Sequence, residues 1–207
     1  MQTEAQFEIV DDLGEVDASA WDALAGPQPF VRHAFLHALE QTGCVGGDTG
    51  WTPRHLLLKR DGELVGALPL YLRDDSTGEF VFDFAWADAY ARYGGRYYPK
   101  LLTAVPFTPV SGRRLLANDD ADRLLLIDGA LALAQQLNVS SWHCLFPTDA
   151  EAGLLASKGL MQRFSTQFHW RNAGYASFDD CLGEMSHDKR KKIRQEQQEL
   201  KKFLRDH

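Results

Sequence analysis

The chain has 207 residues, of which 44% are hydrophobic and 25% charged, a composition typical of a folded globular protein. These values exclude a disordered, collagen-like or disulfide-scaffold chain. The apolar runs are far shorter than the roughly 20 residues of a membrane-spanning helix, so we expect no membrane span. The length predicts one domain, or one domain with an appendage. The first twelve residues are acidic and contain no basic cluster, unlike a signal peptide, and we expect the protein in the cytoplasm.

The cysteines Cys44, Cys144 and Cys181 are far apart and form no CxxC pair, so we expect reduced thiols and no structural metal site. The net charge is −7, but it is unevenly distributed. Residues 187–207 contain eight Lys or Arg and four Asp or Glu, whereas the preceding residues are strongly acidic. This C-terminal segment is therefore predicted to differ in role from the rest of the chain.

Hydrophobic spacing and turn residues predict the elements of the N-terminal part. Residues 7–10 form a short strand, residues 17–24 a helix that ends before Gly26-Pro27, and residues 30–41 a second helix. The runs 55–60 and 64–72 flank Asp61-Gly62, a dipeptide typical of tight hairpin turns. These two runs therefore predict an antiparallel pair of strands.

Strands and helices alternate in the rest of the chain. Strands are expected at residues 79–84, 100–105, 140–146 and 161–170. Helices are expected at 85–93, from a cap at Asn118 or Asp119 to 137, from a Thr148/Glu151 capping box to 158, and from 178 after Ser177. This mixture indicates an α/β or α+β fold with a mixed, mostly antiparallel central sheet and flanking helices. The strands 101–105 and 140–146 are predicted to be adjacent and parallel, because a helix of crossover length joins them.

Residues 82–116 are unusually rich in aromatic side chains, most of which we expect to pack in the core. Tyr97, Tyr98 and Lys100, however, place hydroxyls and an ammonium at the start of a predicted strand, which favours the edge of a polar cleft. The segment after that strand supplies groups that suit binding of an anion, namely Thr108, Gly112, Arg113 and Arg114. A turn with solvated arginines explains these residues equally well.

Two histidines lie in predicted strands and are candidate bases. His143 alternates with Trp142, and His169 lies beside Trp170, two positions after Gln167. A histidine in a strand is more often a hydrogen-bonded structural residue, but its pKa near 6.5 suits it to accept a proton from an attacking amine. Both interpretations stay open at this point.

The C-terminal segment predicts a basic helix that Ser186 caps. Ile193, Leu200 and Leu204 recur at helical spacing and predict one docking face. The basic residues crowd its first half and are either a solvated face or a contact for phosphates of a nucleotide-linked substrate or RNA. The candidate anion-binding residues are Lys189, Arg190, Lys192 and Arg194.

Four blocks resemble the bacterial FemAB-like proteins of the GNAT acyltransferase superfamily, described as peptidoglycan biosynthesis or recognition proteins. The blocks are GEFVFDFAWADAYARYGGR at 78–96, YYPKLLTAVPFTPVSGRRLL at 97–116, MQRFSTQFHWRNAGYASFDD at 161–180 and KRKKIR at 189–194. The resemblance implies a GNAT-like domain at residues 1–185. It also implies that the basic helix at 186–207 begins a linker to a second GNAT-like domain beyond this chain. The Q/RxxGxG/A loop of acetyl-CoA users is missing, since residues 110–114 contain one glycine.

The resemblance implies an N-acyltransferase that joins an acyl or aminoacyl group to an amine of a cell-wall precursor or similar small molecule. The acyl donor, acyl-CoA or aminoacyl-tRNA, is left open, and no certain cofactor or metal is assigned. His143 or His169 would act as the base and Tyr98 as the acid. The positions expected to bind substrate are Tyr97, Lys100, Thr108, Gly112, Arg113, Arg114, Gln167 and Trp170.

A non-catalytic module that recognises peptidoglycan or nucleotide-linked precursors is the alternative, and the single glycine favours it. The acidic charge of residues 1–186 argues against binding to DNA and makes RNA contact through the basic helix a weaker interpretation.

Overall fold

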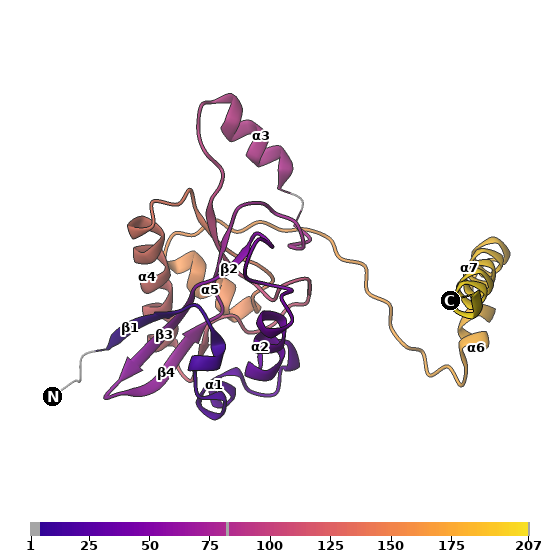
Figure 1. Ribbon diagram of the computed structural model, residues 1–207, viewed down its shortest axis with the longest axis horizontal. Helices are drawn as coiled ribbons and strands as arrows, with labels where there is room; N and C mark the ends of the chain where they lie inside the picture. The colour runs from indigo at the N-terminus through magenta and orange to yellow at the C-terminus, as the bar shows by residue number, and fades with distance from the viewer. Residues whose placement is uncertain (1–4, 82, 207) are drawn as a thin grey trace. The chain divides into compact units, whose positions relative to one another are not determined.

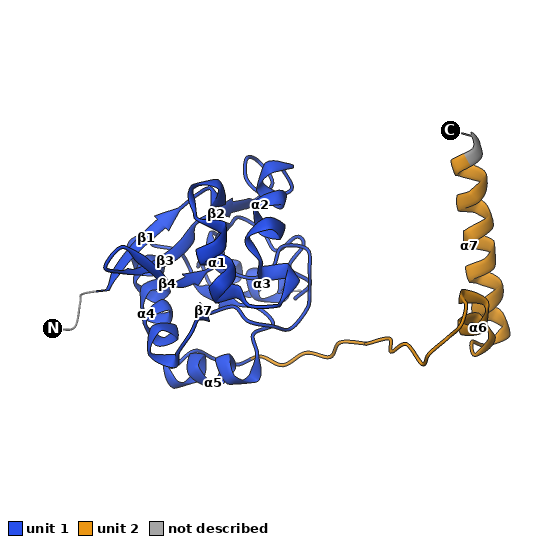
Figure 2. Cartoon of the chain, turned by 90° about the horizontal axis from the view of Figure 1, so that it is seen from below, with its two compact units in different colours: residues 1–162 blue, residues 163–207 orange. Residues whose placement is uncertain are grey.

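The computed structural model describes residues 5–81 and 83–206. The chain forms two compact units, Met1–Gln162 and Arg163–His207, drawn in different colours in Figure 2. The domain boundary expected between residues 185 and 186 stays a prediction. Within the described ranges, every helix is too short or too polar to span a lipid bilayer.

The first sheet of unit 1 is antiparallel, in the order β1-β3-β4-β7. Its strands are β1 (Gln6–Val10), β3 (His55–Arg60), β4 (Glu63–Leu68) and β7 (Leu116–Ala117). The predicted hairpin is confirmed, because β3 and β4 pair around Asp61 and Gly62. Both turn residues have positive φ, 54° and 83°, the conformation for which Asp-Gly is favoured.

The second sheet has the order β2-β5-β6-β8. Its strands are β2 (Trp51–Pro53), β5 (Tyr71–Arg73), β6 (Lys100–Thr103) and β8 (Trp142–Cys144). β6 and β8 are parallel neighbours, with Leu102 opposite His143, which confirms the predicted parallel pair. The α+β class with mostly antiparallel sheets is therefore confirmed, and the strands are divided between two sheets.

Helices cover both faces of the first sheet (Figure 1). Leu56 and Leu58 of β3 pack with α4 (Asp120–Gln136), whereas the intervening Leu57 packs with Trp21 of α1 (Ala18–Ala25) and Leu36 of α2 (His33–Gln41). This alternation is expected, because successive side chains of a strand point to opposite faces. Short 3-10 turns, Leu13–Glu15 and Pro29–Val31, precede α1 and α2.

Local capping signals position the helices as predicted. Asp119 accepts a hydrogen bond from Asp122 N at the start of α4. The predicted capping box of Thr148 and Glu151 is present at the start of α5 (Asp149–Ser157). Ser177 caps α6 (Phe178–Gly183) in the same way.

Two expected strands are wrong. Residues 79–81 and 83–84 are not in a strand, because the carboxylates of Glu79 and Asp83 turn inward to Lys100 and α3 (Phe84–Arg92) begins directly after Asp83. Phe82, which the expected strand includes, lies outside the described residues. Residues 161–170 pair with no strand in the described part of the chain, and Phe168 is 98% exposed.

Unit 2 consists of a stretch without regular structure, the short helix α6 and the basic helix α7 (His187–Asp206). Cys181 and Leu182 of α6 are buried. The predicted basic helix of the C-terminal segment is confirmed as α7. Leu200 and Leu204, which were expected to face apolar surface, are exposed.

Candidate functional site

A buried lysine lies at the centre of a group of polar side chains in unit 1. Lys100 begins β6 and is fully buried. Its Nζ donates to Ser76 Oγ at 2.8 Å, Glu79 Oε2 at 2.8 Å and Asp83 Oδ2 at 2.7 Å. An ammonium has three N–H donors, and these three bonds use all of them. Lys100 is therefore held internally, and an anchoring role toward a substrate anion would require one of these bonds to break.

Arg73 extends this group into a buried ionic cluster, defined here as Arg73, Glu79, Asp83 and Lys100. Its Nε donates to Glu79 Oε1 at 3.2 Å, its Nη2 to Thr77 O at 2.8 Å, and its Cζ lies 3.8 Å from the centre of the Trp51 ring. Because each charge has an opposite partner and hydrogen bonds, the cluster offsets much of its desolvation penalty.

The two carboxyl groups of the cluster differ in their acidity. Burial raises the pKa of Glu79, and the charges of Lys100 and Arg73 only partly oppose it. Burial also raises the pKa of Asp83, but hydrogen bonds and the charge of Lys100 outweigh it, and the pKa lies at about 2. Asp83 is therefore ionised at neutral pH, while its buried Oδ1 accepts no hydrogen bond from a described residue.

Two tyrosines connect the cluster to the surface. Tyr97 OH donates to Asp83 Oδ2 at 2.6 Å, and burial, together with this bond, raises the pKa of Tyr97. Tyr98 OH lies 2.7 Å from Ser76 Oγ, which accepts from Lys100. A chain of hydrogen bonds thus runs from the buried ammonium through Ser76 to the half-buried phenol of Tyr98.

His143 of β8 completes this group. Its ring lies 6.0 Å from the Tyr97 ring, which in turn lies 5.0 Å from the Tyr98 ring, both in edge-to-face geometry. His143 is half-buried, and its Nε2 lies 3.0 Å from Ser141 Oγ. The parallel pairing of β6 and β8 brings these residues together across 46 positions of sequence, from Tyr97 to His143. The structure therefore unites four predicted site residues: Tyr97, Tyr98, Lys100 and His143.

The predicted anion segment lies beyond the other end of β6 and is held by backbone groups. Arg113 donates to Leu24 O at 3.2 Å and to Ala117 O at 3.3 Å. Arg114 is fully buried and donates from Nε to Leu145 O at 2.9 Å. Thr108 Oγ1 donates to Pro106 O, and Gly112 N donates to Phe146 O. Both guanidinium groups are thus bonded to backbone carbonyls, with Arg114 buried and Arg113 half-buried, whereas the anchoring hypothesis expects them to face a ligand.

The remaining predicted substrate and base residues belong to unit 2. His169 and Trp170 are exposed, and Gln167 is half-buried. Trp170 stacks on Tyr175, with ring centres 6.2 Å apart, beside a hollow of about 380 Å³. Their membership of one site with Tyr98 and His143 stays a prediction.

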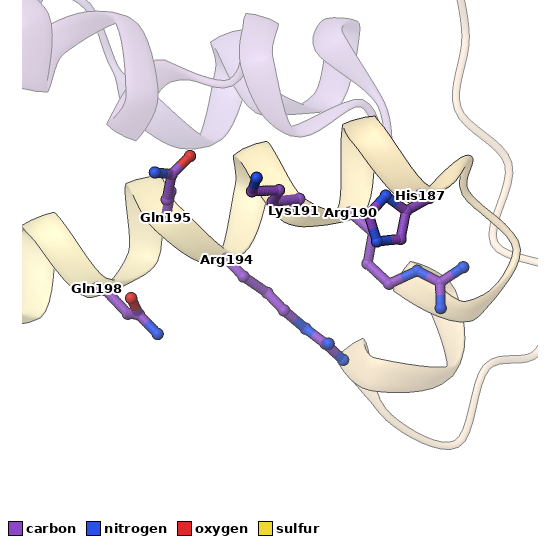
Figure 3. A pocket seen from close by; sticks show the side chains of 6 residues that line it. All are labelled: His187, Arg190, Lys191, Arg194, Gln195 and Gln198. Atoms are coloured by element: carbon purple, nitrogen blue, oxygen red, sulfur yellow. The ribbon is translucent and has the colours of Figure 1, made fainter.

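The basic helix α7 has its own pocket of about 310 Å³, which Figure 3 shows. Arg190 donates from Nη2 to Met185 O at 3.1 Å, while no described residue accepts from its buried Nε. Arg194 lies 3.3 Å from Asp179. Lys189 and Lys192 are exposed and do not line the pocket, whose residues are His187, Arg190, Lys191, Arg194, Gln195 and Gln198.

The acidic and hydroxyl partners of Lys100 were not predicted from the sequence. One signal was present: Lys100 is the only lysine between Lys59 and Lys158, in a region where Glu79 and Asp83 are embedded among aromatic residues. Buried carboxylates need a cation, and only one lysine was near. Glu151 was assigned to the capping box alone, yet its Oε1 also accepts from Arg114 N at 2.8 Å and Leu115 N at 2.7 Å.

Acidic, histidine and cysteine side chains form no cluster suited to a metal ion in the part of the chain that the structure describes.

Comparisons with known proteins assign the family. A solved structure, the ribosomal-protein-alanine N-acetyltransferase from Brucella melitensis biovar Abortus 2308, is similar with a TM-score of 0.49 and 14% identity. The match covers 81% of this chain and 100% of that chain. No curated protein matches. The family model FemAB-like, described as peptidoglycan biosynthesis/recognition, matches residues 12–204. Because this match spans most of the sequence, the chain belongs to the FemAB-like family of peptidoglycan biosynthesis/recognition.

Proposed function

We propose that this protein is an N-acyltransferase that joins an acyl or aminoacyl group to an amine of a peptidoglycan precursor. Membership of the FemAB-like family supports the peptidoglycan substrate. The observation that carries the chemistry is the placement of His143 and Tyr98 around Tyr97, with Tyr98 linked through Ser76 to the buried ammonium of Lys100.

The reaction needs one proton acceptor and one proton donor. The acceptor amine must lose a proton as its nitrogen attacks the donor carbonyl carbon, and neutral His143 is the proposed base. When the bond from this carbon to the leaving atom breaks, that atom needs a proton, and Tyr98 OH is the proposed acid. His169 of unit 2 is the alternative base. Lys100 acts as a positioning residue, because its Nζ is hydrogen-bonded to Tyr98 OH only indirectly, through Ser76, and lies 5.5 Å from the centre of the Tyr98 ring.

The anionic groups of the donor have proposed contacts on α7. Arg190 and Arg194 line its pocket, and Lys189 and Lys192 add positive charge on the same helix. Phosphates of an acyl-CoA or of an aminoacyl-tRNA would interact with these side chains in a salt-dependent way. Arg113 and Arg114 are proposed to support the substrate through the backbone conformation of residues 108–114, since their guanidinium groups bond internally.

A recognition module without turnover is the second candidate. It is favoured by the internal bonding of Lys100 and Arg114 together with the exposed aromatic side chains of α3. Aromatic rings on a surface provide binding area without requiring a reactive group.

One experiment separates the two candidates. The full chain is incubated with a UDP-linked muramyl peptide and with either acyl-CoA or aminoacyl-tRNA, and mass spectrometry measures the mass of the acceptor. Transfer is expected to add one acyl or aminoacyl mass to the amine. It should fall at least tenfold in Tyr98→Phe and His143→Gln, while the control His37→Gln, at a half-buried histidine of α2 outside the proposed site, retains it. Binding without mass gain would support the recognition module, and absence of both would overturn both candidates.

A further inference from the structure

Helix α3 and Tyr93, the residue directly after it, display an aromatic stripe, defined here as Trp86, Tyr90 and Tyr93. Their spacing of i, i+4 and i+7 places them on one face of the helix. They are 51%, 42% and 93% exposed, and no residue of α3 is buried. Figure 1 shows α3 standing away from the two sheets of unit 1. Exposed aromatic side chains gathered in this way indicate a binding surface.

The stripe is firmly attached to the candidate site. Asp83, the residue directly before α3, accepts hydrogen bonds from Lys100 and Tyr97. The Tyr90 ring lies edge-to-face on the Tyr97 ring, with centres 5.3 Å apart. The aromatic rings therefore continue from Tyr90 through Tyr97 to Tyr98 and His143. Because Tyr90 is held by the Tyr97 ring and Asp83 fixes the start of α3, this part of the stripe is organised before any ligand binds.

The composition of α3 favours a carbohydrate over an apolar protein partner. Between residues 84 and 92, alanine is the only aliphatic residue, and Leu, Ile, Val and Met are absent. A helix that docks in a protein groove presents apolar anchors at i, i+3, i+4 and i+7, and the i+3 position of this face is the small Ala89. Sugar rings instead present C–H faces, which pack on aromatic rings, and hydroxyls, which exchange hydrogen bonds with phenol groups such as those of Tyr90 and Tyr93. The exposed ion pair of Asp88 and Arg92, 3.7 Å apart, lies on the opposite face of α3 and leaves the stripe without charge.

We propose that Trp86, Tyr90 and Tyr93 bind the amino-sugar part of a peptidoglycan precursor or fragment. The stripe runs over seven residue steps, from Trp86 to Tyr93, and is about 10 Å long, the length of a short oligosaccharide. A glycan held there would extend its attached peptide toward Tyr97, Tyr98 and His143. The inference rests on the peptidoglycan class of the proposed function but does not require transfer to occur.

The test uses the full chain and three probes: a GlcNAc–MurNAc disaccharide without peptide, the stem peptide without sugar, and vesicles of anionic phospholipid. Isothermal titration measures binding to wild type, Trp86→Leu, Tyr93→Ala and the control Phe164→Leu. Phe164 is an exposed aromatic residue of unit 2 that has no assigned role. Tyr93 is 93% exposed, so Tyr93→Ala tests the stripe without disturbing the fold. Circular dichroism confirms that each variant is folded.

We expect saturable disaccharide binding that weakens at least tenfold in Trp86→Leu and Tyr93→Ala and is unchanged in Phe164→Leu. Trp86→Leu keeps an apolar side chain, so wild-type affinity in this variant would overturn the stacking argument. Binding of the vesicles or of the stem peptide, without the disaccharide, would overturn the carbohydrate assignment. Disaccharide binding with no acyl transfer would uphold the inference while overturning the transferase proposal. If the chain transfers an acyl group equally well in wild type and in the stripe variants, and binds no disaccharide, the transferase proposal stands and the inference about the stripe is overturned.

Discussion

Replacing Lys100 with methionine tests the energetic role of the buried ionic cluster. The substitution keeps the length of the side chain but leaves Glu79 and Asp83 without the ammonium that both of them contact. Removing one partner of a buried ion pair costs about 3–5 kcal/mol, because the remaining charge is desolvated and unpaired. For a chain of this size, about 2–4 °C of melting temperature corresponds to 1 kcal/mol, so we expect Lys100→Met to melt roughly 6–20 °C below wild type.

Thermal unfolding at pH 7, followed by circular dichroism, measures this loss. The matched control is Lys59→Met, whose partner Glu8 is 2.5 Å away but whose ion pair is solvent-exposed. Exposed pairs contribute about 0–1 kcal/mol, so this control should change the melting temperature by only a few degrees. If Lys100→Met loses no more stability than Lys59→Met, the cluster does not carry the free energy assigned to it.

Asp83 determines how the stability difference between wild type and Lys100→Met depends on pH. Its folded pKa of about 2 lies below the ordinary value of 3.8, so its contribution is present above pH 3.8 and is lost as the pH falls through 2. This shift corresponds to roughly 2 kcal/mol. The raised pKa of Glu79 has the opposite effect on stability, because it favours the folded state at acidic pH. Since the contribution of Asp83 is lost on acidification, the difference in free energy of unfolding between wild type and Lys100→Met should narrow between pH 4 and pH 2.

Three further predictions concern other parts of the chain. Glu151→Ala removes a buried carboxylate that accepts from two backbone amides and from the α5 cap, and chemical denaturation should show a loss of about 2–4 kcal/mol. Gly62→Ala places a side chain at φ 83° in open space, so the same assay should show a loss of about 1 kcal/mol from backbone strain alone; an unchanged midpoint would contradict the assigned turn. Arg190→Ala should weaken the binding of inorganic pyrophosphate, measured by isothermal titration, more than Lys189→Ala does, because Arg190 lines the α7 pocket and Lys189 does not. Equal effects of the two variants would indicate attraction by net charge and contradict a pocket-specific contact.

Local rules account for the parts of the fold that the sequence predicted well. The Asp61-Gly62 turn, the Asp119 cap and the Thr148/Glu151 capping box each involve residues within a few positions of one another. Their energies depend on backbone conformation and on one or two nearby hydrogen bonds, which the local sequence specifies. The parallel pair of β6 and β8 was predictable for a related reason, since the length of the intervening helix allows little else.

The candidate site was predicted only in part. Tyr97, Tyr98 and Lys100 were recognised because they are neighbours in the chain, and His143 because histidine is rare and reactive. Their partners were not recognised, since Ser76 and Glu79 lie more than 20 positions before Lys100 and form their bonds only after the chain has folded. The aromatic stripe of α3 was interpreted as core, because hydrophobicity alone does not show whether a ring is buried or displayed.

The sequence by itself determined the element types where local propensity was strong, the mixed fold class and the basic character of the last helix. The tertiary structure alone decided the direction in which each charged group points. Lys100 and Arg114, expected to face a ligand, are buried with internal partners, whereas Trp86 and Tyr93 are exposed. The physical reason is that a buried charge is tolerated only where distant chain segments supply its counter-charge and hydrogen bonds, and local spacing does not encode that coincidence.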